Sequence, residues 1–163
     1  MTRGADRPPA LICRGVAVRD IPALFKLCGE LGYDPSPDRF GERIRDLTAW
    51  AGNAVFVAAD ADDRPVGFIH VFSRPSIEVA PCAQVQALVI SEAARRQGAG
   101  ALLLAAAEQW ARAQGLGAMS LYCSSHREDA HEFYAAQGYD GAITAIRFQK
   151  NIDKSEMEGN SDA

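Results

Sequence analysis

The sequence has little of what a membrane, secreted or metal-binding protein needs. Its longest uninterrupted apolar stretch, Gly100 to Ala107, is far shorter than the roughly 20 residues of a membrane-spanning helix. The first ten residues contain no apolar region of a secretory signal. The four cysteines lie 15, 54 and 41 residues apart and form no CxxC pair. We therefore expect a cytoplasmic protein with free thiols, no membrane partner and no metal.

The charge is also unremarkable, because 17 basic residues face 21 acidic ones and the net charge is −4. A protein without a basic surplus is a poor candidate for binding nucleic acid through a general positive field. Apolar residues make up 48 % of the 163 residues, which suits one globular domain with a proper core. We expect a flexible arm at 1–10, one folded domain at 11–150 and an acidic disordered tail at 151–163.

Hydrophobic periodicity predicts an α/β (α+β) fold, in which a central mixed sheet carries helices on both faces. Strands are predicted at Leu11–Val18, Ala54–Ala59, Pro65–Ser73, Ala83–Ile90, Met119–Ser124 and Ile143–Gln149. Helices are predicted from an N-cap at Asp20 to Gly32, from Ser36 to Trp50, over Gly98–Gln114 and over Arg127–Ala136. In the longest helix, the apolar stripe is assigned to Ala99, Leu102, Leu103, Ala106, Trp110 and Ala113.

The stretch between the fourth strand and the longest helix has the composition of an anion-binding loop. Gly98 and Gly100 let the backbone approach a ligand, and the helix start contributes unpaired N–H groups that favour phosphate. Arg95 and Arg96 add two positive charges beside the glycines. The plain alternative is a tight turn with ordinary surface arginines. Neither the GxxxxGK[ST] loop nor the complete GxGxxG fingerprint is present.

Two motifs together resemble the GNAT acyltransferase superfamily. R-R-Q-G-A-G (95–100) looks like its [QR]-x-x-G-x-[GA] signature, and D-A-H-E-F-Y-A-A-Q-G-Y (129–139) resembles its second signature. The order of predicted elements matches the family from Leu11 to Lys150. The resemblance implies a single GNAT-like domain with a mostly antiparallel mixed sheet of six to seven strands. It also implies acetyl-CoA as the cosubstrate of an N-acetyltransferase.

The resemblance assigns roles to particular positions. Backbone groups of one strand would hold the pantetheine arm of acetyl-CoA, namely those of Leu88, Val89 and Ile90. Loop amides would hold the pyrophosphate, with Arg95 nearby, namely those of Arg96, Gln97, Gly98, Ala99 and Gly100. Tyr134 would lie beside the thioester sulfur as the general acid. The alternative for Tyr134 is a core aromatic residue packed beside Phe133.

The resemblance assigns no general base, because the strand that often carries a glutamate in related enzymes has Gln84, Gln86 and Ala87 here. The remaining candidates are Glu78 in the preceding loop, His70 and a water chain. Glu78 is equally explained as a solvated loop residue. His70 is either packing or the wall of a cavity, since it alternates with Phe68 and Phe72.

The expected acceptor is a primary amine on a small molecule, because the second motif is similar to GNATs that acetylate aminoalkylphosphonates and aminoglycosides. In those relatives the histidine at position 131 belongs to the helix framework. A group of carboxylates could face a cationic amine or simply be solvated: Asp20, Asp34, Asp38 and Glu42. An acyl-CoA-binding sensor, a protein N-terminal or lysine acetyltransferase, and a homodimer stay open.

Overall fold

The computed structural model describes residues 10–30, 32–33, 36–141, 143–150 and 152. These residues fall into two compact units, one ending at Leu121 and the other beginning at Tyr122. The expected arm and tail therefore lie outside the described residues except for Ala10 and Ile152, and so does Asp34. No helix in the described part of the chain combines the length and apolarity that crossing a bilayer requires.

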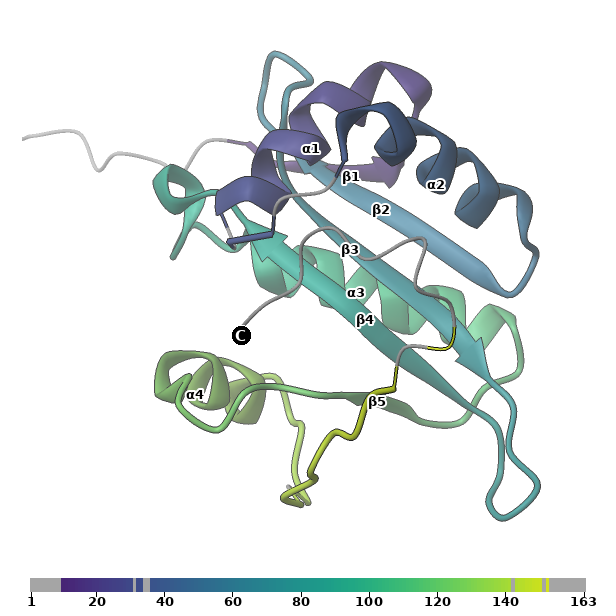
Figure 1. Ribbon diagram of the computed structural model, residues 1–163. Coiled ribbons are helices and arrows are strands. Elements are labelled where there is room, and N and C mark those ends of the chain that lie inside the picture. Colours follow the sequence, from purple (N-terminus) through teal and green to yellow (C-terminus); the bar gives the residue numbers. More distant parts are fainter. Residues whose placement is uncertain (1–9, 31, 34–35, 142, 151, 153–163) are drawn as a thin grey trace, which may run out of the picture. The chain divides into compact units, whose positions relative to one another are not determined.

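The first unit is built on a five-stranded sheet with the spatial order β1-β2-β3-β4-β5 (Figure 1). The strands are β1 (Ile12–Gly15), β2 (Asn53–Ala59), β3 (Pro65–Arg74), β4 (Cys82–Ile90) and β5 (Met119–Leu121). The first four pair antiparallel with their neighbours, whereas β5 pairs parallel to β4. The expected mixed, mostly antiparallel sheet is thereby confirmed.

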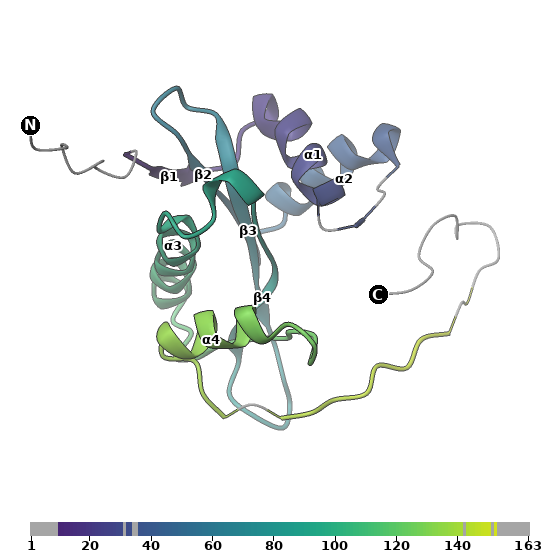
Figure 2. The ribbon, with the colours of Figure 1, turned by 90° about the vertical axis from the view of Figure 1, so that its left-hand side faces the viewer.

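Helices cover both faces of this sheet (Figure 2). One face carries α1 (Ile21–Glu30) and α2 (Pro37–Ala49), and the other carries α3 (Ala99–Ala113). Pro37 occupies the first turn of α2 behind Ser36, as the sequence predicted. On the α1–α2 face, apolar side chains from the helices pack against three strands to form one core cluster: Leu24, Leu27, Phe40, Val55, Val57, Phe68 and Val89.

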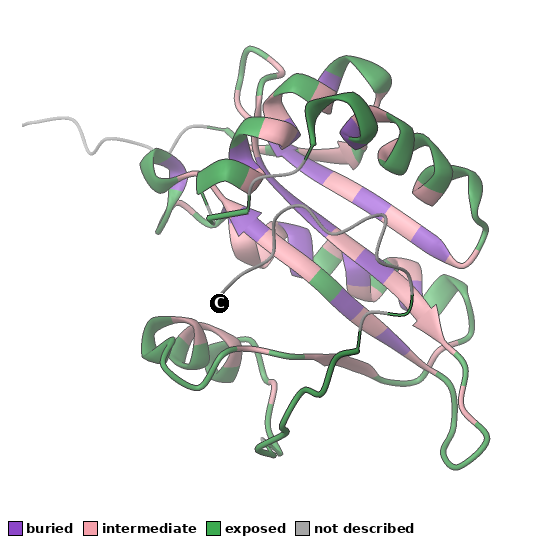
Figure 3. Ribbon diagram, in the orientation of Figure 1, coloured by how far each residue is buried: buried purple, intermediate pink, exposed green. Residues whose placement is uncertain are grey.

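The buried stripe of α3 is rotated from the predicted one. Ala99 and Leu103 are buried as expected, but the stripe continues through Leu104, Ala107 and Ala111. Because this helix is apolar on several sides, periodicity alone leaves the phase of the stripe ambiguous. Packing against β2, β3 and β4 selects the face that is buried in the structure (Figure 3).

The prediction of a strand at Ile143–Gln149 is wrong. The described sheet has five strands, where six to seven were expected. This segment belongs to the second unit, and its apolar side chains are exposed, with Phe148 at 90 %. Alternating apolar residues suit a strand, but a strand exists only when a neighbour completes its hydrogen bonds. The segment pairs with no strand in the described residues.

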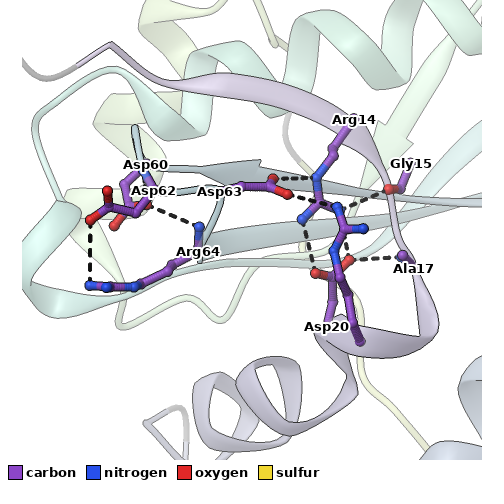
Figure 4. Close-up of polar contacts among 9 residues, drawn as sticks. Arg14, Gly15, Ala17, Asp20, Asp60, Asp62, Asp63 and Arg64 are labelled. Carbon is purple, nitrogen blue, oxygen red and sulfur yellow. Dashed lines mark hydrogen bonds and ion pairs between the residues drawn. The ribbon is translucent and has the colours of Figure 1, made fainter.

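Asp20 also differs from its predicted role as a cap at the start of α1. It ends a short 3-10 turn, Val18–Asp20, and its carboxylate is 2 % exposed. The guanidinium of Arg14 donates two hydrogen bonds to it, of 2.7 and 2.9 Å, and the N–H of Ala17 donates a third of 2.7 Å (Figure 4). Arg14 also binds Asp63 in the β2–β3 turn at 2.7 Å. Asp20 therefore joins β1 to the start of α1. Its buried carboxylate is already occupied by these hydrogen bonds and is not available to an acceptor amine.

Replacing Asp20 by Asn should lower the free energy of unfolding by about 2 kcal/mol, because the buried carboxylate loses the charge that strengthens its two hydrogen bonds from Arg14, while Arg14 keeps Asp63 as its other partner. The bonds from Arg14 hold the pKa of the Asp20 carboxyl below its ordinary 3.8. The wild type therefore keeps this contribution above about pH 4 and loses it as the pH falls through the lowered pKa. Denaturant titrations between pH 2 and pH 7 measure both effects.

Asp62→Asn is the matched control, because the ion pair of Asp62 with Arg64 is long (3.6 Å) and both side chains are at least 70 % exposed. We expect a change within about 0.5 kcal/mol for this variant. Equal losses of unfolding free energy in the two variants would show that the Arg14–Asp20 pair stabilises the fold no more than an exposed ion pair does.

Candidate active site

The edge of β4 that faces β5 is open over half of its length. β5 pairs with β4 only at Ala83–Val85, so within the described residues no strand continues this ladder beside Gln86–Ile90. On its other edge β4 is paired with β3 as far as Ile90. Alternate N–H and C=O groups of a strand point to each edge, so the open edge offers backbone donors and acceptors to a ligand. The predicted pantetheine-binding residues Leu88, Val89 and Ile90 lie on this stretch.

β4 leads directly into the predicted phosphate loop. A 3-10 turn at Glu92–Ala94 is followed by four turn residues and then by α3. Gly98 takes φ +88°, and Arg96 is also left-handed at φ 61°. The amide of Leu102 bonds to the carbonyl of Gly98 at 3.0 Å, so the amides of Ala99, Gly100 and Ala101 precede the helical ladder.

The surroundings of this loop suit an anion. A Cβ built on Gly98 would have no atom within 4 Å, so space is open beside the helix start. The side chains of Arg95 and Arg96 are exposed and form no ion pair within the described part of the chain. The side chain of Gln97 is used internally, since its Nε2 donates to the carbonyl of Ala93 at 2.8 Å. The loop can thus present amides and two cations to a diphosphate.

Gly67 helps to position the open edge of β4, a role that was not predicted from the sequence. It pairs with Ile90, and a Cβ at this position would lie 2.7 Å from the carbonyl oxygen of Val89. Any side chain here would push β4 away from β3 at the residues that form the open edge. A glycine inside a strand pattern often marks such a close backbone approach, and that signal was available in the sequence.

The second unit contains α4 (Glu128–Ala136), which carries Tyr134. The Tyr134 ring is half-buried and makes edge contacts with Phe133 and Tyr139, at centroid distances of 5.3 and 5.9 Å. Burial, and then the nearby Cys123, raise the pKa of its phenol. Tyr134 is therefore protonated at neutral pH, which is the state a general acid needs.

His131 is held within the same unit, because its Nε2 lies 3.0 Å from the carbonyl oxygen of Ser124. This contact joins α4 to the segment before it and agrees with the framework role expected for His131. Among the carboxylates considered for the acceptor, Asp38 and Glu42 are exposed on α2.

The two base candidates lie in different places. Glu78 is exposed in the β3–β4 connection, where Ser76 Oγ accepts its N–H. That connection joins β4 at Cys82, about 20 Å along the strand from Leu88. His70 pairs with Ala87, next to Leu88, and burial lowers the pKa of its imidazole. A hollow of ≈ 360 Å³ exists elsewhere, but its lining lies along and just after α2: Arg43, Asp46, Leu47 and Trp50.

A sequence profile of the Acetyltransferase (GNAT) family matches residues 21–139, which include the open edge, the loop and α4. The chain belongs to this family. GNAT enzymes use acetyl-CoA, and the protein is an acetyl-CoA-dependent N-acetyltransferase. The fold and the cosubstrate that the resemblance implied are therefore confirmed.

Named relatives agree with this assignment. The chain is 29 % identical to aminoalkylphosphonate N-acetyltransferase of Salmonella typhimurium, over 85 % of this chain and 91 % of the relative. It is 26 % identical to aminoglycoside N(6')-acetyltransferase type 1 of Serratia marcescens, over 72 % of this chain and 83 % of the relative. Among solved structures, AAC(6')-Iy in complex with the bisubstrate analogue CoA-S-monomethyl-acetylneamine shares the fold, with a TM-score of 0.78, 18 % identity and coverage of 87 % and 99 %.

Gly98→Val should abolish measurable binding of CoA, because the side chain would fill the space beside the loop amides and strain a residue at φ +88°. Isothermal titration with CoA measures the effect.

Gly115→Val is the matched control, since Gly115 also has a positive φ, +73°, and open space around it, but follows the other end of α3. Both variants should lose about 1–2 kcal/mol of stability from the strained backbone. Only Gly98→Val should lose CoA affinity, and equal affinity in the two variants would contradict the loop assignment.

Proposed function

We propose that this protein transfers the acetyl group of acetyl-CoA to a primary amine of a small molecule by direct attack. The observation that carries the proposal is the continuity of the open β4 edge with the loop at Arg95–Gly100. A thioester-bearing arm can lie along the strand while its diphosphate meets the amides at the start of α3.

In this proposal the backbone performs most of the catalysis. The amides of Arg96–Gly100 hold the diphosphate, and Arg95 contributes charge beside it. N–H groups of Leu88–Ile90 bind the pantetheine arm and polarise the carbonyl oxygen of the thioester. Holding the thioester next to a bound amine makes the attack of the neutral amine effectively unimolecular.

Tyr134 is proposed as the general acid. The new C–N bond forms as the C–S bond breaks, and the phenol donates its proton to the departing thiolate. A thiolate with an ordinary pKa near 8.5 needs only a weak acid, and Tyr134 is kept protonated by its burial in the second unit. The proton lost by the amine must go to a base, and Glu78 stays a prediction from the sequence for that role.

A small-molecule acceptor is favoured by the relatives. The two enzymes compared above are named for aminoalkylphosphonates and aminoglycosides, and this chain spans 91 % and 83 % of their lengths. We transfer from them only the class of acceptor, a primary amine on a small molecule.

The direct test mixes the protein with acetyl-CoA and single amines, including aminoalkylphosphonates, aminoglycosides and lysine peptides, and follows the release of free thiol. We expect turnover with at least one small amine and none with the peptides. Turnover with peptides alone would replace the proposal by protein acetylation. CoA binding without any turnover would point to a sensor of acyl-CoA.

Tyr134→Phe should lower kcat by about 10²-fold, in the range of general acid catalysis, because the leaving thiolate loses its proton donor. The affinity for CoA should stay within twofold of the wild type. Tyr122→Phe is the matched control, since Tyr122 is 68 % exposed, and its kcat should not change. Unchanged turnover of Tyr134→Phe would remove this residue from the mechanism.

A further inference from the structure

The sheet face that carries α1 and α2 changes from apolar to polar along its length. Val55 and Val57 of β2 belong to the core cluster, and Asn53 lies on the same face because side chains alternate. His70 pairs with Val55 and so shares that face. Asn53 pairs with Phe72, Phe72 with Gln84, and Gln84 with Ser120. Four polar side chains on four strands thus share this face, with Phe72 between Asn53 and Gln84, and we call them the polar row: Asn53, His70, Gln84 and Ser120.

Two members of the polar row are joined by a hydrogen bond. His70 Nε2 lies 2.9 Å from Asn53 Oδ1. Because an amide oxygen only accepts, Nε2 carries the proton, and in the neutral imidazole the lone pair is left on Nδ1. Burial lowers the pKa of His70, so the neutral form prevails at pH 7. Asn53 thereby sets which nitrogen of His70 can accept a hydrogen bond.

The amide nitrogen of Asn53, Nδ2, has no hydrogen-bond acceptor among the described residues. Asn53 is only 9 % exposed, yet its Nδ2 has no acceptor within the described structure. A desolvated donor without a partner weakens the folded state, and native proteins rarely keep one. The remainder of the polar row is half-buried and therefore reachable from solvent. An acceptor atom of a bound molecule would satisfy Nδ2.

The polar row lies next to the strand segment that the proposed function assigns to the thioester arm. His70 is paired with Ala87, the residue before Leu88. At this point the β3–β4 register advances by two residues on β4 for one on β3, which passes over Gln86. A molecule bound along the polar row would therefore lie beside the beginning of the Leu88–Ile90 stretch.

We propose that the polar row is the acceptor subsite and that Asn53 and His70 determine its specificity. Asn53 Nδ2 donates to a hydroxyl oxygen of the acceptor, and His70 Nδ1 accepts a hydrogen bond from a second hydroxyl or from the amine. The four side chains carry no charge, so the favoured acceptor is a hydroxylated amine recognised through neutral hydrogen bonds. This inference rests on the proposed acetyl transfer.

The test compares two amines that share one carbon skeleton, 2-amino-1,3-propanediol (the diol) and 2-aminopropane. A third amine, 2-aminoethylphosphonate, carries a negative charge. Initial rates of thiol release at saturating acetyl-CoA give kcat and KM for each. With the concentration of each amine expressed as its neutral form, the full chain should prefer the diol to 2-aminopropane by about 10-fold or more in kcat/KM, which corresponds to one satisfied hydrogen bond. It should also prefer the diol to the phosphonate.

Two variants separate specificity from folding. Asn53→Leu removes both polar atoms of Asn53 at nearly constant size, and His70→Phe removes both ring nitrogens of His70 while keeping a planar ring. Each variant should bring the ratio of kcat/KM for the diol to kcat/KM for 2-aminopropane towards 1, because the KM of the diol rises. The KM of acetyl-CoA and the melting temperature should stay close to those of the wild type. Gln114→Leu, an exposed amide beyond α3, is the control and should keep the full preference.

The outcomes are distinct. An unchanged diol preference in Asn53→Leu, or a wild type that prefers 2-aminopropane or the phosphonate, would overturn the subsite while leaving acetyl transfer intact. If the wild type releases no thiol with any amine of the broad panel, the proposed function fails, and this inference fails with it.

Discussion

Backbone hydrogen bonding along β4 is the constraint on which the rest of the structure depends. Every buried N–H and C=O needs a partner, and on the β3 side the ladder supplies one as far as Ile90. On the other side β5 supplies partners only at Ala83–Val85. The unpaired stretch is stable because it is open to solvent or to a ligand, and it leads without interruption into the loop at the start of α3. Gly67 keeps this stretch close to β3.

The two faces of the sheet are covered by different helices, and each helix layer positions a different part of the candidate site. α3 buries a stripe against one face, which fixes the direction in which its first amides point. On the opposite face, α1 and α2 cover the apolar cluster, and the Arg14–Asp20–Asp63 contacts anchor the start of α1 to β1 and to the β2–β3 turn. The polar row continues that face beyond the cluster. The apolar cluster therefore lies next to a region in which the Asn53 Nδ2 has no acceptor among the described residues.

Much of this arrangement could be predicted from the sequence. Strands β2, β3 and β4 and helix α2 follow from alternation, 3.6-residue periodicity and the Ser36–Pro37 start signal, which are local properties. The turn between β4 and α3 was also predictable, because glycines at positions 98 and 100 favour a break in the regular backbone before the helix, whereas phosphate binding by this turn stays a prediction. The strand at Ile143–Gln149 was not, since its alternation is local but its pairing would be non-local.

The amino-acid sequence by itself determined the order of the elements as far as α4, the positions of the glycines with positive φ, and the family signatures at Arg95–Gly100 and Asp129–Tyr139. All of these depend on residues close together in the chain. Only the tertiary structure decided where β5 stops pairing with β4, that Asp20 is buried against Arg14, and that Asn53 meets His70 from 17 residues away. These contacts depend on strand register and helix packing, and no local pattern encodes which distant side chain will be the neighbour.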